Sequence, residues 1–415
     1  MGTQIIRNGT LIDGNGEQPI DAGAVLVADG RIAAVGREGS FAIPGDATEI
    51  DAGGGTILPG MIDAHVHLFM EGLDLQTTLT SPFSLHFYRA IDHMRRTLDA
   101  GITSVRDAGG IDLGVKTAVE RGLVAGPRIQ LSLSSPTTTG GHVDGWMLSG
   151  NTFEVFPAHP GNPGGLCDGP NEARRKVRQL LRAGADVIKV CATGGVSSPT
   201  DHPDFVQFSP EELAIMVQEG RYRNGVRVMA HAEGAEGIKN AVRAGVHSIE
   251  HGFILDDEAI ELMLDRGTFL VPTLSVLPGV LASADGPAPA PDYALVKARE
   301  YGSEHRDSIA RAQRAGVRIA MGTDAAAIPH GTNLQELGLM CECGMTPMEA
   351  LVATTGAGAE CLGWEDRVGT LEAGKLADVV IARTDPLADI RSLEQTSNIA
   401  LVMKGGEVVK DIREA

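Results

Sequence analysis

The sequence is poor in cysteine, in aromatic side chains and in basic residues. Its five cysteines among 415 residues form an odd, sparse set, which argues against a disulfide scaffold and fits a reducing compartment. Two Trp and four Tyr are too few for a surface that stacks nucleic-acid bases. Lys and Arg number 35 against 54 Asp and Glu, a formal net charge of −19. We therefore expect no nucleic-acid partner, because binding nucleic acid requires concentrated positive charge.

Long apolar runs are also missing. No stretch approaches the ~20 apolar residues that span a bilayer, so we expect no membrane partner. The first 30 residues lack the basic and then apolar pattern of a secretory signal, and we expect a cytoplasmic protein. Hydrophobic residues at 43% and charged residues at 21% are typical of a globular chain. The length suits two or three domains, or one large barrel with an appendage.

Both ends of the chain carry short β-like segments separated by turn residues such as Asn8-Gly9 and Gly405-Gly406. At the N-terminal end the segments are 4–7, 24–28, 31–35 and 48–51. At the C-terminal end they are 378–383, 399–404 and 407–410. This pattern predicts one small β-sandwich domain formed discontinuously from residues 1–56 and 364–415.

The middle of the chain, residues 57–363, alternates β-like and amphipathic helical segments. The expected strands are 57–63, 103–106, 128–132, 186–190, 227–231, 248–251, 268–272 and 318–321. The expected helices include 172–183, 210–219, 235–244, 256–265 and 304–315. Eight such β-then-α units predict an α/β fold, a (β/α)8 TIM barrel. The long segments 134–168 and 271–292 follow strands, and we expect them to form walls of a pocket at the active-site rim.

Candidate metal ligands lie where the expected strands end. His65 and His67 are two residues apart, so both side chains can point to one face of the first strand. His231 and His251 close two later strands, and Asp324 follows the last one. A single such histidine is more often a hydrogen-bonded core residue. Four histidines with a carboxylate, all at one end of a barrel, instead suit zinc or a similar divalent ion.

Lys189 lies inside an otherwise apolar strand. A buried salt bridge or a side chain that reaches solvent would each explain it. Beside four metal-type histidines, a third role is open. A desolvated lysine loses its proton readily, and its free amine can react with CO2 to give a carbamate that bridges two cations.

The set in strand order resembles that of the amidohydrolase superfamily: His-x-His after the first strand, Lys after the fourth, His after the fifth and sixth, and Asp after the eighth. The resemblance implies a centre of two divalent ions, Zn²⁺ with Mn²⁺ or Co²⁺ as alternatives. It implies one ion on His65, His67 and Asp324 and the other on His231 and His251. Lys189 is then an N6-carboxylysine between them.

Within the superfamily, segments 105–110, 140–142, 193–200 and 208–212 resemble the Xaa-Pro dipeptidase and imidazolonepropionase-related members. This resemblance implies that His142 hydrogen-bonds the scissile carbonyl oxygen. The chain departs from the dipeptidase pattern at Glu233, where those relatives carry a tyrosine. It also departs from the related deaminases, which carry a glutamate where this chain has Gly234.

The resulting hypothesis is a homo-oligomeric, metal-dependent hydrolase. We expect it to cleave an amide bond in a small carboxylate-bearing substrate such as an Xaa-Pro dipeptide or an N-acyl amino acid. A hydroxide that bridges the metals would attack the carbonyl, with Asp324 as general base and acid. The alternatives are a lactone or other ester hydrolase, a deaminase, and a barrel without catalytic function.

Overall fold

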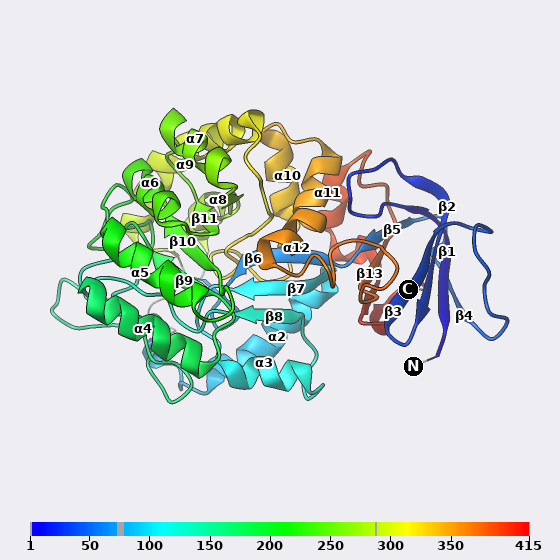
Figure 1. Ribbon diagram of the computed structural model, residues 1–415, viewed down its shortest axis with the longest axis horizontal. Helices are drawn as coiled ribbons and strands as arrows, with labels where there is room; N and C mark the ends of the chain where they lie inside the picture. Colours follow the sequence, from blue (N-terminus) through cyan, green and yellow to red (C-terminus); the bar gives the residue numbers. More distant parts are fainter. Residues whose placement is uncertain (1, 73–78, 287–288, 415) are drawn as a thin grey trace.

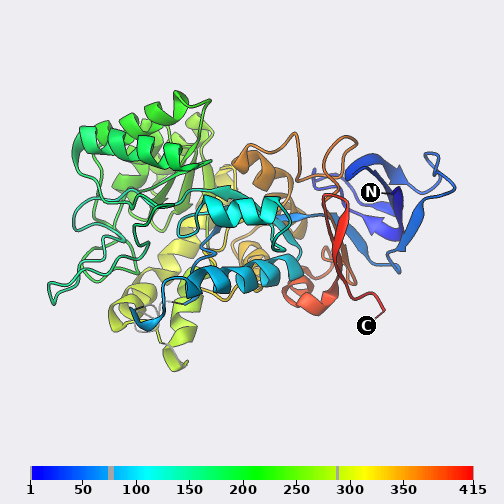
Figure 2. The same ribbon diagram turned by 90° about the horizontal axis from the view of Figure 1, so that it is seen from below.

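In the computed structural model, a β-rich unit formed by both ends of the chain lies beside an α/β unit formed by the middle (Figure 1). The structure describes residues 2–72, 79–286 and 289–414. Figure 2 shows the same division from below, with both termini in the β-rich unit.

The terminal unit is one sheet of eight strands in the order β15-β14-β13-β5-β1-β2-β3, with β4 paired to β1. Strand β5 joins the two ends of the chain, because Ile57 pairs with Leu11 of β1 and with Ile381 of β13. Apolar residues from both ends share one core, which includes Ile6, Val25, Ile57, Val379 and Leu401. The strands are β1 (Gln4–Leu11), β2 (Ile20–Ala28), β3 (Arg31–Arg37), β4 (Thr48–Asp51), β5 (Thr56–Pro59), β13 (Val379–Ala382), β14 (Ile399–Lys404) and β15 (Glu407–Asp411).

The predicted strand 57–63 is two strands in the structure. Its first half belongs to β5 of the terminal sheet, and its second half lies in β6 (Met61–Val66). Gly60 separates them at a crowded point, since a Cβ atom there would lie 2.3 Å from Thr103 Oγ1. The apolar run therefore crosses from one unit into the other.

The strands of the middle form two parallel sheets, β6-β7-β8 and β12-β11-β10-β9. Backbone hydrogen bonds lie in the two gaps between these sheets. Asp186 N, just before β9, donates to Leu131 O of β8 over 2.7 Å, and Ala64 N of β6 donates over 2.8 Å to Met321 O, in the segment beside β12. The predicted strand 318–321 is not assigned as a strand, and only Ile319 forms an isolated bridge with Leu270. The remaining strands are β7 (Ile102–Asp107), β8 (Arg128–Leu131), β9 (Ile188–Cys191), β10 (Val228–Ala232), β11 (Ser248–His251) and β12 (Phe269–Val271).

Helices surround these strands (Figure 1). They are α2 (Leu85–Asp99), α3 (Leu113–Glu120), α4 (Gly169–Ala183), α5 (Pro210–Arg221), α6 (Ala235–Ala244), α7 (Asp257–Arg266), α8 (Val276–Ala282), α9 (Asp292–Ala315), α10 (Gln335–Glu342), α11 (Pro347–Ala353) and α12 (Gly356–Leu362). The short 3-10 helices are η1 (Ser283–Asp285), η2 (Ile390–Glu394) and η3 (Thr396–Asn398). Among the helices of the described residues, none is both long and apolar enough to cross a bilayer.

Two helices differ from the sequence prediction. Helix α9 begins at Asp292, whereas the sequence predicted that it begins at residue 304. Helix α8 lies inside the segment 271–292, which the sequence predicted to be a loop. The two helices pack on each other, and Val280 and Ala294 belong to one apolar cluster that also holds Val196. This packing stabilises α8 and the first turns of α9, where the local sequence pattern only weakly indicates a helix. The segment 134–168 contains no helix or strand and forms only isolated bridges, as its loop prediction implies.

Candidate active site

The six predicted metal ligands lie in one pocket. They come from β6 and the residue just after it, from β9, β10 and β11, and from the turn after residues 318–321, and all of their side chains line the same cavity. Because the strands are parallel, their carboxyl ends meet at one side of the fold. The structure thus brings together His65, His67, Lys189, His231, His251 and Asp324.

Contacts among these side chains are short. Asp324 Oδ1 lies 3.2 Å from His67 Nε2 and 3.6 Å from His65 Nε2. Lys189 Nζ lies 3.2 Å from His65 Nε2, and within the described residues it has no carboxylate partner within the 4.0 Å ion-pair distance. The ring of His251 stands 5.1 Å from that of His65. A buried lysine that faces an imidazole nitrogen argues against the salt-bridge explanation of Lys189.

The backbone is strained at two of these positions. His251 has φ +73° and Asp324 has φ +55°, a left-handed conformation that non-glycine residues rarely adopt. Such strain persists only where the surrounding structure imposes it, and it concentrates at functional sites.

A buried carboxylate orients His65. Its Nδ1 donates to Glu250 Oε2 over 2.7 Å, which leaves Nε2 free to face the pocket. Arg106 Nη2 donates to the other oxygen of Glu250 over 2.9 Å. Burial opposes ionisation of Glu250, but the charge of Arg106 and the hydrogen bond from His65 lower its pKa to about 2. Sequence reasoning missed this pair, although a charged residue inside an apolar strand was a usable signal at both positions.

Two further histidines are held in the same way. His67 Nδ1 donates to Gly109 O over 2.9 Å, and His251 Nδ1 lies 2.7 Å from Thr273 Oγ1. These contacts leave the Nε2 atom of each ring for the pocket. An orienting contact on the second nitrogen is what metal-binding histidines generally have.

Burial determines the protonation of the site. Burial, and then the charge of Lys189, lower the pKa of His65 to about 4. Burial and His231 hold the pKa of His251 well below its usual value. Burial opposes ionisation of Asp324, but the hydrogen bond from His67 keeps its pKa well below the ordinary range. Burial opposes protonation of His67, but the hydrogen bond to Asp324 raises its pKa. The neutral imidazoles of His65 and His251 and the ionised carboxylate of Asp324 are the forms that bind a divalent ion.

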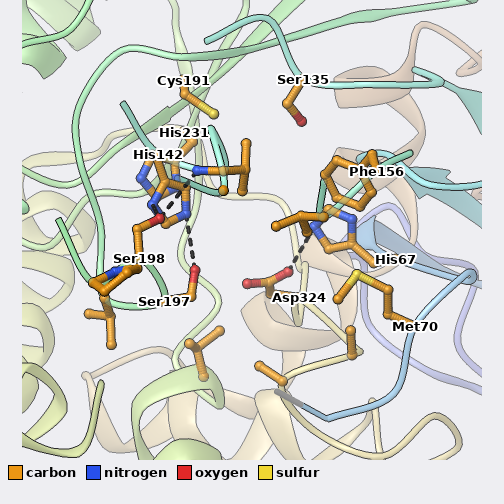
Figure 3. Close-up of a pocket in the computed structure, with 18 of the residues that line it drawn as sticks. His67, Met70, Ser135, His142, Phe156, Cys191, Ser197, Ser198, His231 and Asp324 are labelled. Carbon is orange, nitrogen blue, oxygen red and sulfur yellow. Dashed lines mark hydrogen bonds and ion pairs between the residues drawn. The ribbon is translucent and has the colours of Figure 1, made fainter. Parts of the chain in front are cut away.

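His142 lies across the pocket from His67 and Asp324 (Figure 3). Its ring stacks on that of His231, with centroids 4.2 Å apart and an angle of 9° between the planes. Its Nδ1 lies 3.2 Å from Asp201 Oδ2, and its Nε2 lies 3.2 Å from Ser197 Oγ. The histidine predicted to contact the substrate is therefore a fixed part of the pocket wall.

Residues 56–409 match the model of the amidohydrolase family. The chain belongs to the amidohydrolase family. It is, as expected, a hydrolytic enzyme of the class that acts on amide bonds.

Three similar proteins show how far this amidohydrolase resembles known ones. The ochratoxinase of Aspergillus niger is 36% identical over 423 residues, covering 98% of this chain and 86% of its own. A crystal structure of an Xaa-Pro dipeptidase with bound methionine is 34% identical, with a TM-score of 0.89 over 99% of this chain and 100% of that one. A crystal structure of a prolidase complexed with N-methylphosphonate-L-proline is 32% identical, with a TM-score of 0.90 over 99% of this chain and 100% of that one. The resemblance to dipeptidase-type amidohydrolases is confirmed.

The donor atoms of this amidohydrolase suit divalent ions. Two groups each bring their ligand atoms within 4.8 Å of one another: His65, His251 and Asp324 form one group, and His231, Glu233 and His251 form the other. Imidazole nitrogens and carboxylate oxygens are the ligands of zinc and similar ions. The residues present therefore fit a metal centre, while the assignment of each ligand to one of two ions stays a prediction.

Aromatic and aliphatic side chains form most of the remaining wall of the pocket. They come from the segment 134–168, from the loop after β9, and from α8 and α9. The main ones are Trp146, Phe153, Phe156, Val196, Val276, Val280 and Tyr293. Cys191 also lines the pocket, but burial raises the pKa of its thiol to about 12, as expected for an apolar filler rather than a nucleophile.

Proposed function

We propose that this amidohydrolase hydrolyses an amide bond in a small, carboxylate-bearing, peptide-like substrate such as an Xaa-Pro dipeptide or an N-acyl amino acid. The observation that carries the proposal is the convergence of four imidazoles, a carboxylate and a buried lysine on one pocket. The similarity to an Xaa-Pro dipeptidase and to a prolidase that binds a proline phosphonate supports the peptide-like substrate.

The proposed scaffold is a closed (β/α)8 barrel. The hydrogen bond from Asp186 to Leu131 supports closure on one side, because Asp186 leads directly into β9. On the other side, the segment 318–321 lies between β6 and β12: Ala64 donates to Met321 O, and Ile319 bridges to Leu270. We keep the division into a terminal domain of residues 1–56 and 364–415 and a barrel of residues 57–363. Strand β5 lies across that boundary.

The proposed cofactor is a pair of divalent cations, with Zn²⁺ as the first candidate. His65, His67, His231, His251 and Asp324 would hold them, with Lys189 as a carboxylated bridge. When bound, such cations acidify water and polarise the carbonyl group of the substrate. The missing carboxylate partner of Lys189 in the described structure supports the bridging role, because a carbamate would turn this amine into an anionic ligand.

Two side chains of the chain itself complete the proposed reaction. Asp324 accepts a proton from the attacking water at a carboxylate oxygen and passes it to the departing amine, which leaves poorly without it. His142 donates from Nε2 to the carbonyl oxygen, where negative charge develops. Its Nδ1 is held by Asp201 and by Ser198 Oγ at 3.1 Å, so Nε2, which contacts the Ser197 hydroxyl at 3.2 Å, is the nitrogen that would meet the substrate in place of that hydroxyl.

The test is hydrolysis by the metal-loaded enzyme of dipeptides, N-acyl amino acids and lactones, with metal counted per chain. We expect amide cleavage, about two cations per chain, and loss of activity on chelation. Lys189→Ala should lose metal and turnover, and small carboxylic acids should restore part of both by replacing the carbamate. Preference for lactones would favour the ester-hydrolase alternative. An enzyme that stays inert with Zn²⁺, Mn²⁺ and Co²⁺ would refute the proposal.

A further inference from the structure

Glu233 follows β10 directly and carries a buried carboxyl group that lines the pocket. The residue is 3% exposed, and its backbone N–H donates to Thr193 Oγ1 over 2.9 Å, which fixes its position. Its Oε1 lies 3.9 Å from His231 Nε2. Its Oε2 is fully buried and has no hydrogen-bond partner among the described residues.

No cationic side chain of the described structure is available to pair with this carboxyl group. Lys189 is the one Lys or Arg in the described lining of the pocket, and it contacts His65 instead. The nearby Lys297 uses its three N–H donors on backbone carbonyls, those of Gly195, Ser198 and Asp201, at 2.9, 2.8 and 2.7 Å. A buried carboxyl oxygen without a partner is costly, and the described chain offers it none.

We infer that Glu233 is a specificity-determining residue that receives the free α-ammonium group of a dipeptide substrate. The inference rests on the proposed function and narrows it to substrates with an unblocked amino end, which excludes N-acyl amino acids. An ammonium group supplies the missing donor and forms a charge-assisted hydrogen bond. The α-amino group fits best because it lies two bonds from the scissile carbonyl carbon.

Position supports the α-amino group over a basic side chain. Glu233 Oε1 is 3.9 Å from the His231 ring, which stacks on His142, the proposed donor to the carbonyl oxygen. A group bound by Glu233 therefore sits next to the reacting bond, whereas the charge of a lysine or arginine side chain would reach farther away. The aromatic and aliphatic wall, with Trp146 and Phe153, then accommodates an apolar first side chain.

The test compares three substrates of one scaffold: an apolar dipeptide, its N-acetyl form, and its deamino analogue, in which hydrogen replaces the α-amino group. We expect the wild-type enzyme to favour the free dipeptide by at least about 100-fold in kcat/KM. Glu233→Gln should lose most of that preference while it still cleaves the deamino analogue and binds as much metal. Glu236→Gln, at an exposed glutamate in the first turn of α6, is the matched control and should keep the preference.

The remaining outcomes separate failure of this inference from failure of the proposed function. Loss of metal in Glu233→Gln would make Glu233 a metal ligand and overturn the inference, as would equal wild-type rates on the free and N-acetyl substrates. If the loaded wild-type enzyme cleaves none of the three, the proposed function fails instead. Calorimetric binding of the free dipeptide and the deamino analogue to wild type and Glu233→Gln then decides the role of Glu233 without turnover.

Discussion

Among the described residues of this amidohydrolase, two pairs of histidines stack with nearly the same geometry. His142 stacks on His231 with centroids 4.2 Å apart and planes at 9°. His93 stacks on His330 with centroids 4.4 Å apart and planes at 15°. The first pair lines the pocket, and the second lies outside its described lining. Stacking by itself therefore does not mark a functional histidine.

The partners of the ring nitrogens separate the two pairs. His93 Nδ1 donates to Leu68 O over 2.8 Å, and His330 Nε2 donates to Met70 O over 2.9 Å. The other nitrogen of His93, Nε2, lies 3.2 Å from Glu71 Oε2 in the same segment. This pair thus holds the backbone that follows His67. The nitrogens of His142 instead meet the side chains of Asp201, Ser197 and Ser198 at the pocket wall. We expect changes near the first pair to affect turnover and changes in the second to affect stability.

The largest effect is expected at Asp324, across the pocket from the first pair. Asp324→Asn should lower kcat by about 10³-fold or more, because the amide cannot accept the proton of the attacking water. Asparagine tolerates the φ of +55° at this position, so the fold should remain. Steady-state kinetics with metal counted per chain measures the effect. A kcat close to that of the wild type would remove Asp324 from the mechanism.

The direct test of the comparison is to change one histidine of each pair. His142→Asn should lower kcat by about 100-fold, because it removes a donor to the carbonyl oxygen. His93→Asn should leave kcat close to the wild-type value and lower the free energy of unfolding by about 1–3 kcal/mol, because it disturbs the buried contact with Leu68. Kinetics and denaturant unfolding of both variants decide the matter. Similar losses of kcat in the two variants would break the comparison.

A smaller effect is expected at Lys297, which holds the loop that carries Ser197, Ser198 and Asp201. Lys297→Met should lower kcat by about 10-fold and leave the metal content unchanged, because His142 loses its fixed orientation. In a His142→Asn background the same change should add little. If the fold-loss of kcat in the double variant equals the product of the two single losses, Lys297 acts independently of His142.

The matched control is Lys404→Met, at a partly buried lysine of the terminal sheet whose Nζ donates to Gly126 O over 2.6 Å. It should lower stability without a change in kcat. Hydrogen–deuterium exchange gives a second measurement: the Lys297 variant should exchange faster in residues 194–204, and the Lys404 variant should not.

An effect confined to acidic conditions, with none expected on kcat at neutral pH, is the pH dependence of stability at His330. Burial, and then the charge of His93, lower its pKa to about 3. Since this lies below the value of about 6.5 in an unfolded chain, the stabilising contribution is complete above pH 6.5 and is lost as the pH falls toward 3. His330→Gln should reduce the slope of unfolding free energy against pH by up to about 1.4 kcal/mol per unit in that range. An unchanged slope in chemical unfolding at pH 4, 5 and 6 would contradict this.

Local patterns predicted most elements of the α/β unit. The predicted helix 235–244 and the predicted strand 248–251 have the same bounds in α6 and β11, since Gly234 precedes the helix and Gly245 ends it in a left-handed conformation. Helix α9 starts earlier than predicted because residues such as Ala294 and Leu295 are stabilised by the cluster with α8. Residues 318–321 form only one isolated bridge, between Ile319 and Leu270, although the local pattern predicted a strand there.

The sequence by itself identified candidate metal ligands and the end of the strands at which they lie, because side-chain chemistry and strand periodicity are local properties. Only the tertiary structure decided which atoms these side chains present. It placed Glu250 and Arg106 behind His65, stacked His142 on His231, and left Glu233 Oε2 without a partner among the described residues. These contacts join residues from different strands and loops, so they depend on how the elements pack, which no local pattern encodes.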